Sequence, residues 1–203
     1  MTQKIIASGA EANIILSNDF IIKDRISKTY RIKELDEKIR KTRTKSETKL
    51  LTKAEKIIPC PLPFFKPEVS NQIKMPFISG KKLSEHLDKL SLKDQIQICK
   101  QIGENIAKLH ENHIIHGDLT TSNMILKDDE IFFIDFGLGY ISKKVEDKAV
   151  DLHLLKQALE AKHFVHWKIL FEEFQKAYSK DYSESKQIFE RITAVERRGR
   201  YRH

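Results

Sequence analysis

The sequence HGDLTTSN occupies residues 116–123, and the sequence DFG follows at residues 135–137. The first stretch places a carboxylate, Asp118, five residues before an amide side chain, Asn123, and the second begins with another acid, Asp135. These side chains offer the oxygen atoms that phosphoryl transfer needs, which are one carboxylate to orient an attacking hydroxyl or water and two hard ligands for Mg²⁺. We therefore take these two stretches as the centre of the fold and of any activity.

A short hairpin is expected between the two stretches. Residues 124–126 (MIL) and 131–134 (IFFI) are β-rich runs, and the polar residues 127–129 (KDD) between them favour a tight turn. Such a hairpin returns the chain to its starting point, so Asp135 would emerge beside Asn123. A chance loop of polar residues is a poor alternative, because two motifs occur in order and each follows an apolar segment.

The first 80 residues predict a small antiparallel sheet and one long helix. The sheet is expected over three β-rich runs, which are residues 4–6, 12–16 and 20–23. A charged helical pattern runs from Leu35 to Ile57 and stops before the prolines at positions 59, 61 and 63. A further strand pair is expected after the prolines, with Gln72 to Ile78 as its second member.

Beyond Gly80 the pattern is mostly helical. Ser84 can cap a short helix, and Ser91 starts a longer helix with Asp94 in its first turn. Six apolar residues continue the longer helix at helical spacing: Leu92, Ile96, Cys99, Ile102, Ile106 and Leu109. Three more helices are expected near residues 147–162, 164–178 and 183–196. The predicted fold class is α+β.

Three features before Asp118 are assigned functions because they precede Asp118 and Asp135 in the order seen in kinases. Lys23 ends a strand, as does the lysine that contacts the phosphates of ATP in kinases, and Glu47 in the long helix can pair with it. The loop of residues 9–12 (GAEA) lies between the first two strands, and its small residues let a phosphate approach the backbone. No Walker A sequence occurs, so the pattern indicates a kinase-like site and not a P-loop.

Three polar residues near the 116–123 stretch are expected to have structural roles. His116 is expected to be a structural member of this loop, and Asp151 to be a buried acid that accepts hydrogen bonds from the loop backbone. His110 is expected at the end of the long helix, where a cation favours the helix dipole. A zinc site among the histidines is conceivable, but no cysteine or carboxylate completes one convincingly.

Composition and charge set the broad class. Hydrophobic residues make up 40% of the 203 residues and charged residues 33%, a share that can fill a core. No run approaches the roughly 20 apolar residues that cross a bilayer, no signal peptide is recognised, and the two cysteines lack a partner motif. A cytoplasmic protein without membrane contact is therefore expected. The net charge of +8 gathers in residues 23–53 and 191–203, which indicates a polyanionic partner or, for each run alone, a solvated surface.

Several parts of an ordinary protein kinase are missing from the sequence. No Ala-Pro-Glu occurs, and 15 residues separate Asp135 from Asp151, too few for a long activation segment. Gly117 stands where an arginine would pair with a phosphorylated activation loop, and Thr120 stands in place of a lysine two positions after the base. These differences argue against a protein kinase that is switched by phosphorylation.

The chain resembles the family of small atypical kinase/ATPase subunits of the KEOPS (EKC) complex, which is related to the RIO kinases. The similar segments span nearly the whole chain: Gly9–Ala12, Ile22–Lys23, Tyr30–Arg31, Glu34–Asp36, Arg43–Thr44, Glu47, Lys49–Leu51, His116–Asn123, Asp135–Leu138 and Arg198–Arg200. This combination is more specific than His-Gly-Asp alone, which small-molecule kinases also carry.

The resemblance implies a minimal two-lobed, protein-kinase-like fold. Residues 1–80 would form an N-terminal lobe with a small β-sheet and one long helix, and residues 81–203 a reduced, mostly helical C-terminal lobe. It also implies binding of ATP with Mg²⁺ or Mn²⁺, autophosphorylation on serine or threonine, and ATP hydrolysis. The family's complex makes threonylcarbamoyladenosine beside the anticodon of tRNA. The implied partners are a threonylcarbamoyl transferase subunit and a small subunit on the N-terminal lobe, with tRNA reached through the complex.

The same resemblance implies a role for each motif residue. Asp118 would be the catalytic acid/base, and Asn123 and Asp135 would be the metal ligands. Lys23 would contact phosphate, with Glu47 as its ion-pair partner. The phosphate-covering loop would consist of Gly9, Ala10, Glu11 and Ala12. The tail that reaches toward the transferase and tRNA would comprise Arg197, Arg198, Arg200 and Arg202.

Two alternative functions stay open. The same site would serve a serine/threonine protein kinase with external protein substrates, although the short C-terminal lobe weakens this interpretation, and a small-molecule kinase is a weaker variant of it. A scaffold for tRNA or the transferase, whose nucleotide site only regulates assembly, is favoured by the basic segments. A partner surface and simple solubility are equally good explanations for six cations: Lys28, Arg31, Lys38, Arg40, Lys41 and Arg43.

Overall fold

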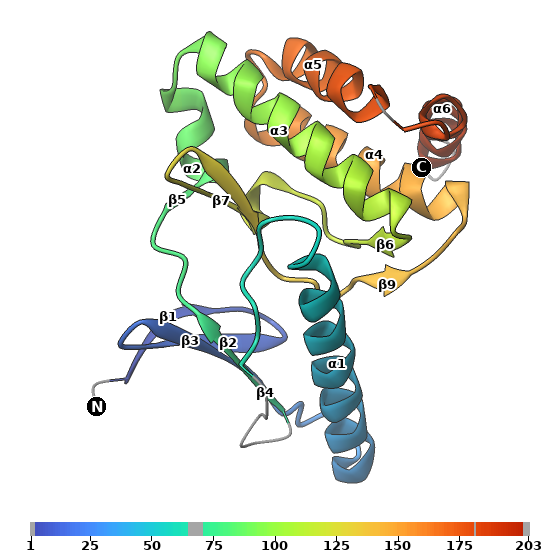
Figure 1. Ribbon diagram of the computed structural model, residues 1–203. Helices are drawn as coiled ribbons and strands as arrows, with labels where there is room; N and C mark the ends of the chain where they lie inside the picture. Colours follow the sequence, from blue (N-terminus) through green and yellow to red (C-terminus); the bar gives the residue numbers. More distant parts are fainter. Residues whose placement is uncertain (1–2, 65–70, 181, 201–203) are drawn as a thin grey trace.

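The structure is a computed structural model that describes residues 3–64, 71–180 and 182–200. Its N-terminal part is a four-stranded antiparallel sheet in the order β1-β2-β3-β4 (Figure 1). The strands are β1 (Gln3–Ser8), β2 (Ala12–Ser17), β3 (Phe20–Arg25) and β4 (Gln72–Pro76). The three predicted strands of the meander are confirmed, and each is one to three residues longer than expected.

The strand that follows the prolines joins this same sheet. β4 lies antiparallel to β3, from Phe20 opposite Pro76 to Asp24 opposite Gln72. A strand was expected over Gln72 to Ile78 as the second member of a pair, and it forms over Gln72–Pro76. The N–H of Phe64 bonds to the carbonyl oxygen of Lys74 at 2.8 Å, and residues 65–70, where the first member of that pair would fall, lie outside the described residues. The pairing of β4 with β3 was not expected. The physical reason for this pairing is that β3 would otherwise present an open edge, whose N–H and C=O groups β4 satisfies.

One long helix, α1 (Lys33–Ala54), lies between β3 and β4 in the chain and extends from beside the sheet toward the helical part (Figure 1). It begins two residues and ends three residues earlier than the predicted 35–57. Its last turns bury Leu50, Leu51 and Ala54 in the core, whereas its first turns are largely exposed. Because the buried end anchors the helix, Glu47, one turn earlier, is held at a fixed position facing the sheet.

The remaining described chain is mostly helical, as predicted, so the α+β class is confirmed. Its elements, in chain order, are β5 (Lys81–Lys82), α2 (Leu83–His86), the 3-10 helix η1 (Leu87–Lys89), α3 (Leu92–Glu111), β6 (Ile114–Ile115), the 3-10 helix η2 (Thr121–Asn123), β7 (Met124–Lys127), β8 (Glu130–Phe133), β9 (Tyr140–Ile141), α4 (Val145–Lys162), α5 (Trp167–Ser179) and α6 (Ser185–Arg200). None of the helices in the described ranges is both long and apolar enough to cross a membrane.

The two predicted helix caps have different outcomes. Ser91 caps α3, because its hydroxyl oxygen accepts a hydrogen bond from the backbone N–H of Asp94 at 3.2 Å. Ser84 does not cap α2, since the helix has already begun at Leu83 with Lys82 in the cap position. The prediction for Ser84 is therefore wrong. The pairing of Lys82 with β7 brings the chain into the helix one residue early.

The core of the helical part depends on close packing of α3 against α5. The apolar stripe of α3 is buried as predicted at Cys99, Ile102, Ile106 and Leu109, whereas Leu92 at its start is exposed. Gly103 lies at the contact between the two helices. A Cβ atom added there would lie 2.5 Å from the carbonyl oxygen of Phe174 and 3.0 Å from the Cβ atom of Ala177. The absence of a side chain at Gly103 thus sets how closely α3 and α5 approach.

Gly103→Ala is expected to destabilise the protein by about 1–3 kcal/mol, because the added methyl group forces two packed helices apart. The better helix propensity of alanine, about 1 kcal/mol, offsets only part of this cost. Urea unfolding followed by circular dichroism measures the change. Glu104→Ala, at the exposed neighbouring position on α3, is the control and should change stability by less than about 0.5 kcal/mol. Equal stability of the two variants would contradict the packing argument.

Candidate active site

The predicted hairpin forms and brings Asp135 beside Asn123. β7 and β8 pair from Met124 opposite Phe133 to Lys127 opposite Glu130. The backbone N–H of Ile134 then bonds to the carbonyl oxygen of Asn123 at 3.0 Å, so the next residue, Asp135, emerges at the base of the hairpin. The expectation drawn from the two motifs is confirmed at the level of geometry.

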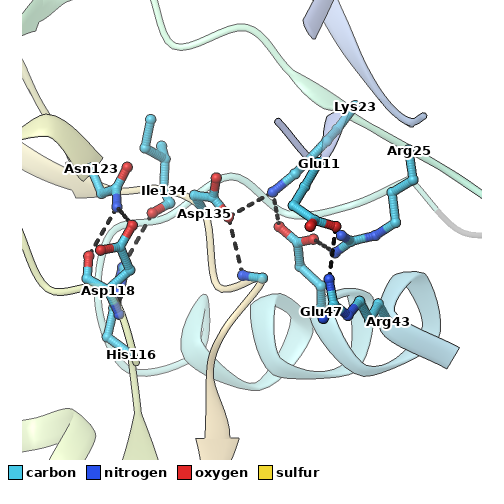
Figure 2. A network of polar contacts seen from close by, with 11 residues as sticks. Glu11, Lys23, Arg25, Arg43, Glu47, His116, Asp118, Asn123, Ile134 and Asp135 are labelled. Atoms are coloured by element: carbon cyan, nitrogen blue, oxygen red, sulfur yellow. Dashed lines mark hydrogen bonds and ion pairs between the residues drawn. The ribbon is translucent and has the colours of Figure 1, made fainter. Parts of the chain in front are cut away.

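Asn123 also holds Asp118 in place. Its side-chain amide nitrogen donates to the Asp118 carboxylate at 2.8 Å and to the Asp118 carbonyl oxygen at 2.9 Å. Figure 2 shows the amide oxygen of Asn123 pointing away from Asp118. Because both donors of the amide are used on Asp118, its oxygen is the atom that remains to accept or to bind a cation.

Lys23 joins the sheet to the hairpin. Its ammonium group contacts Glu47 of α1 at 2.7 Å and Asp135 at 2.6 Å, although Lys23 and Asp135 are 112 residues apart. Figure 2 shows these side chains in one row between β3 and the hairpin. The predicted pairing of Lys23 with Glu47 is confirmed. A lysine held by two carboxylates has an extended, fixed position.

Arg25 also pairs with Glu47, and the sequence analysis did not predict this contact. Arg25, two residues after Lys23 on β3, contacts the other carboxylate oxygen of Glu47 at 2.6 Å. The side chains of Lys23, Arg25 and Glu47 are 7%, 4% and 0% exposed. Since alternate residues of a strand lie on one face, the Lys-x-Arg spacing on β3 was the available signal.

Asp135 has an unusual backbone and an acidic side chain. Its φ angle is +63°, a left-handed conformation that aspartate and asparagine tolerate better than most residues. Burial alone would raise the pKa of its carboxyl group. The Lys23 ammonium and the N–H of Gly137, which donates to Asp135 at 3.1 Å, outweigh this effect and hold the pKa below its ordinary value. Asp135 is thus a carboxylate at neutral pH.

Asp151 of α4 holds the 116–123 loop in place. This buried carboxylate accepts the backbone N–H groups of His116 at 2.8 Å and Gly117 at 2.9 Å, as predicted. His116 is fully buried, and its ring contacts the carbonyl oxygen of Ile134 at 3.2 Å. Burial lowers the pKa of His116 despite the acids around it, so the ring is neutral at pH 7. The expected structural role of both residues is consistent with these contacts.

His110 lies in the last turn of α3, as predicted. Its ring is fully buried and lies between the hydroxyl of Tyr178, at 2.8 Å, and the carboxylate of Asp151, at 3.2 Å. The end of α3 packs against α5, and this contact shields the His110 ring from the solvent. His110 therefore supports Asp151, which in turn supports the loop.

The loop of residues 9–12 closes over this group of side chains. The N–H of Gly9 bonds to the carbonyl oxygen of Ala12 at 3.0 Å, which makes a tight turn between β1 and β2. Glu11 forms an ion pair with Arg43 of α1 at 2.7 Å. A cavity of about 380 Å³ lies under the loop, and its lining includes all four loop residues together with Lys23, Asp118 and Asp135.

A second cavity of about 330 Å³ adjoins the first and shares Lys23 and Asp135 with it. Its wall is largely apolar and comes from both parts of the chain, with Ile14, Ile21 and Met75 on one side and Ile125 on the other. An apolar slot that opens toward a lysine and two acids suits a nucleotide, with the base in the slot and the phosphates under the loop.

The residues present fit a magnesium nucleotide. The amide oxygen of Asn123 and the carboxylate of Asp135 are hard oxygen donors, and Mg²⁺ bound to nucleotides usually takes one or two such protein ligands plus phosphate oxygens. A Cβ atom at Gly137 would lie 2.9 Å from Asp135 and 3.5 Å from the Lys23 ammonium, so the glycine keeps this corner open. In the described ranges, no group of three His, Cys, Asp or Glu side chains could hold a metal ion by itself.

The remaining predicted residues lie apart from this site. His163 bonds to Asp88 at 2.9 Å and to Thr121 at 3.0 Å, so it connects helices rather than forming a zinc site. Arg31 and Arg40 both pair with Asp36, which makes part of the basic segment an internal ion-pair network. Arg197, Arg198 and Arg200 fall within the last turns of α6, with side chains that are not described, and Arg202 lies outside the described residues.

Glu47→Gln is expected to destabilise the protein by about 3–5 kcal/mol, because Lys23 and Arg25 would lose the charge that compensates them in a buried setting. Urea unfolding at neutral pH measures the loss. Glu37→Gln, at an exposed position of the same helix, is the matched control and should stay within about 0.5 kcal/mol of the wild type. A loss below about 1 kcal/mol for Glu47→Gln would contradict the role of Glu47 as the compensating charge for both cations.

Comparisons with known proteins agree with this geometry. A family model described as RIO domain matches residues 18–152. The KEOPS complex subunit Bud32 of Pyrococcus abyssi is 42% identical, over 98% of this chain and 96% of the relative. A probable serine/threonine-protein kinase BUD32 homolog of Archaeoglobus fulgidus is 36% identical, over 95% of this chain and 94% of the relative.

A longer relative and a solved structure complete the comparison. A probable bifunctional tRNA threonylcarbamoyladenosine biosynthesis protein of Methanobrevibacter smithii is 41% identical over 100% of this chain, which spans 38% of that relative. The Rio2 kinase of Chaetomium thermophilum, solved as an ADP/Mg²⁺-phosphoaspartate complex, superposes with a TM-score of 0.64 over 98% of this chain and 71% of that chain. Its sequence identity is 15%, so the likeness shows the fold alone, which is protein-kinase-like.

Proposed function

This chain belongs to the RIO domain family of atypical serine/threonine kinases, and from that membership we propose that it is a kinase/ATPase subunit of a KEOPS complex. In that role it would support the threonylcarbamoyladenosine modification of tRNA by hydrolysing ATP and would also phosphorylate itself on serine or threonine. The Pyrococcus relative, which is similar over nearly its full length, supports the proposed membership in a KEOPS complex. The bifunctional relative supports the modification, although this chain spans only 38% of it.

The observation that carries the proposal is the meeting of Lys23, Asp118 and Asp135 on the wall of one cavity. These residues come from the N-terminal sheet, the 116–123 loop and the end of the hairpin. We propose that residues 1–80 form one lobe and residues 81–203 the other, with the nucleotide between them. Such an arrangement holds the phosphate end of ATP among the groups that transfer a phosphoryl group in kinases.

We propose a role for each residue at this site. Lys23, held by Glu47, contacts the phosphates, and the loop formed by Gly9, Ala10, Glu11 and Ala12 covers them. Asn123 and Asp135 hold Mg²⁺ or Mn²⁺ through their side-chain oxygens. The metal ion, when bound, neutralises negative charge on the phosphates.

Asp118 then orients the nucleophile and accepts its proton. Its carboxylate is fixed by the Asn123 amide at 2.8 Å, and its loop is fixed by the bonds from His116 and Gly117 to Asp151. A pre-positioned base removes the need to reorganise the site when the hydroxyl or water attacks. A protein hydroxyl and a water molecule can use the same carboxylate, so the partner decides which of them enters.

The proposed partners are a threonylcarbamoyl transferase subunit and a small subunit bound to the N-terminal lobe, with tRNA reached through the complex. Ile5 and Ile6 of the edge strand β1 are 58% and 43% exposed, which supports a docking place on that lobe. The tail residues Arg197, Arg198, Arg200 and Arg202 are proposed to reach toward the transferase and tRNA. We also propose a cytoplasmic location, in keeping with action on tRNA.

Reconstitution of the complex tests this proposal. Wild-type protein is combined with the transferase subunit, the small subunit, tRNA, ATP and the threonylcarbamoyl donor, and modified adenosine is measured. Asp135→Asn should abolish support of repeated modification, because it removes a metal-binding charge while keeping a residue that tolerates the positive φ angle. Asp128→Asn, exposed and also at positive φ, is the matched control and should support normal modification. Full modification with Asp135→Asn would overturn the proposal.

A serine/threonine kinase with an external protein substrate is the second candidate function. The name of the Archaeoglobus relative and the complete set of site residues favour it. It differs from the first in the fate of the phosphoryl group, which would end on a partner protein and not in solution. Incubation of the assembled complex with γ-labelled ATP separates the two.

A further inference from the structure

The phosphate end of the cleft contains an ion pair that the proposed mechanism does not use. Arg43 comes from the middle of α1, and Glu11 comes from the loop that covers the cavity of about 380 Å³. Figure 2 shows the two side chains meeting. Their charged groups lie 2.7 Å apart, and the side chains of Arg43 and Glu11 are 39% and 49% exposed. Within the described residues, Glu11 is the one carboxylate at ion-pair distance from Arg43.

Glu11 stands where a carboxylate is unfavourable once a nucleotide binds. It lines the same cavity as Lys23, Asp118 and Asp135, so phosphates placed there would meet its negative charge. An ion pair between half-exposed side chains is weak, so a phosphoryl group can displace Glu11 at little cost. Displacement releases the Arg43 guanidinium, whose planar donors match a phosphate better than a single carboxylate contact.

Arg25 offers a second guanidinium on the same wall. It lines the cavity beside Arg43, and its side chain is 4% exposed. One of its terminal nitrogens is used on Glu47, but no described residue accepts a hydrogen bond from its buried Nε. An under-satisfied guanidinium next to Arg43 gives this end of the cavity spare donors for an anion.

Lys28 provides a second attachment for the loop of residues 9–12. Its ammonium group donates to the carbonyl oxygen of Ala10, the residue before Glu11. The loop is therefore held over the cavity at two consecutive residues, by Lys28 and by Arg43. A phosphoryl group that binds Arg43 in place of Glu11 would break one of these two attachments.

We propose that Arg43, assisted by Arg25, forms a phosphoryl-binding site that Glu11 occupies as an internal anion in the absence of ligand. The proposal rests on the function proposed above, because it needs a nucleotide whose phosphates point into this cavity. The ligand is a phosphoryl group beyond the β-phosphate of the nucleotide. It is either the terminal phosphate of ATP or the inorganic phosphate that hydrolysis releases. Exchange of Glu11 for this group would make the position of the loop depend on whether that phosphoryl group is bound.

Calorimetric titration of the full chain with Mg²⁺ tests the proposal with three probes. The probes are AMP-PNP, ADP, and inorganic phosphate added to ADP-bound protein. Arg43→Gln is expected to weaken AMP-PNP about tenfold or more and to change ADP binding by less than about twofold, because a charge-assisted contact to the terminal phosphate is lost. Glu11→Gln is expected to tighten AMP-PNP several-fold, since the competing carboxylate has lost its charge.

Lys45→Gln is the matched control. It removes the same charge from α1 two residues further on, at an exposed position on the opposite side of the helix. It should leave all three titrations close to those of the wild type. Thermal unfolding verifies that Arg43→Gln folds as the wild type does, which is expected for a side chain that is 39% exposed.

Each outcome decides a separate point. Selective weakening of AMP-PNP supports the site with the ATP terminal phosphate as its ligand, and loss of inorganic phosphate binding alone supports it with the released product. If Arg43→Gln behaves like Lys45→Gln, or weakens ADP and AMP-PNP equally, the phosphoryl site is overturned while the proposed function stands. If the wild type binds neither nucleotide, the proposed function fails and this inference fails with it.

Discussion

Asp118→Asn is expected to slow ATP turnover by about two to four orders of magnitude without weakening nucleotide binding more than a few-fold. The carboxylate has no nucleotide-binding role in the proposed mechanism, so its loss should act on turnover and spare affinity. Asparagine has nearly the shape of aspartate and can keep a hydrogen bond to Asn123, but it cannot accept a proton from the attacking hydroxyl or water. Phosphate release under saturating ATP measures the effect.

Asp128→Asn provides the control for this experiment. Asp128 lies in the turn of the neighbouring hairpin, is exposed, and has a φ angle of +48° that asparagine tolerates. The same chemical change there should leave turnover within about twofold. If Asp118→Asn retained more than about a tenth of wild-type turnover, the carboxylate would not be the group that accepts the proton, and another residue would have to take that role.

Asp151→Ala is expected to cost about 3–5 kcal/mol of stability at neutral pH, which is a large part of the total for a domain of this size. The Asp151 carboxylate accepts the N–H groups of His116 and Gly117 and contacts His110, and its side chain is 1% exposed. Alanine would leave those buried donors without an acceptor. Urea unfolding measures the loss of stability.

The loss should depend on pH in a defined direction. Burial by itself would raise the pKa of Asp151, but the hydrogen bonds from His110 and from the loop backbone hold it below its ordinary value. A carboxyl group with a depressed pKa in the folded state contributes its full stability above the unfolded pKa, about 3.9, and loses it as the pH falls through the folded pKa. The stability difference between wild type and variant should therefore be largest near pH 7 and smaller near about pH 3.

Asp147→Ala is the control for this experiment. It lies on the same helix, is only half-buried, and bonds to the hydroxyl of Ser142 at 2.5 Å. It should cost about 1 kcal/mol, the usual value of one partly exposed hydrogen bond. Equal losses for the two variants, or a loss at Asp151 that grows toward acid pH, would contradict the role given to this carboxylate.

Short-range signals in the sequence predicted the centre of the site well. Asn123 and Asp135 flank a hairpin of ten residues, so a local turn is enough to bring them together. The pairing of Lys23 with Glu47 and the contact of Asp151 with the loop span longer distances. They were expected because their order along the chain follows that of known kinases. The roles of these residues in catalysis and metal binding stay predictions until they are tested.

Contacts between distant polar residues were beyond the sequence analysis. A pattern of charges cannot tell which cations another element will cover, so the partners of Arg25, Arg43 and Lys148 were not predicted. Lys148 is fully buried. Its ammonium group bonds to the hydroxyl of Tyr182 at 2.5 Å and to Glu184, just before α6. Long-range pairing of this kind depends on how helices pack, which periodicity does not encode.

His110 and β4 show the same limit. The helix pattern correctly placed His110 in the last turn of α3, but its burial depends on Tyr178 of α5, 68 residues later. The residues of β4 were correctly predicted as a strand, yet the choice of β3 as partner depends on an open sheet edge and not on the local sequence. Element type was thus predictable where element partners were not.

The fate of the γ-phosphate of ATP tests the central claim most directly. Purified protein is incubated with γ-labelled ATP and Mg²⁺, first alone and then with the transferase subunit, the small subunit and tRNA, with Asp118→Asn as the inactive reference. The account predicts that free phosphate rises sharply when the partners are present, with little label on protein beyond autophosphorylation, and that Asp118→Asn abolishes the rise. Label that moves mainly onto a partner protein, or free phosphate that is unchanged by Asp118→Asn, would contradict it.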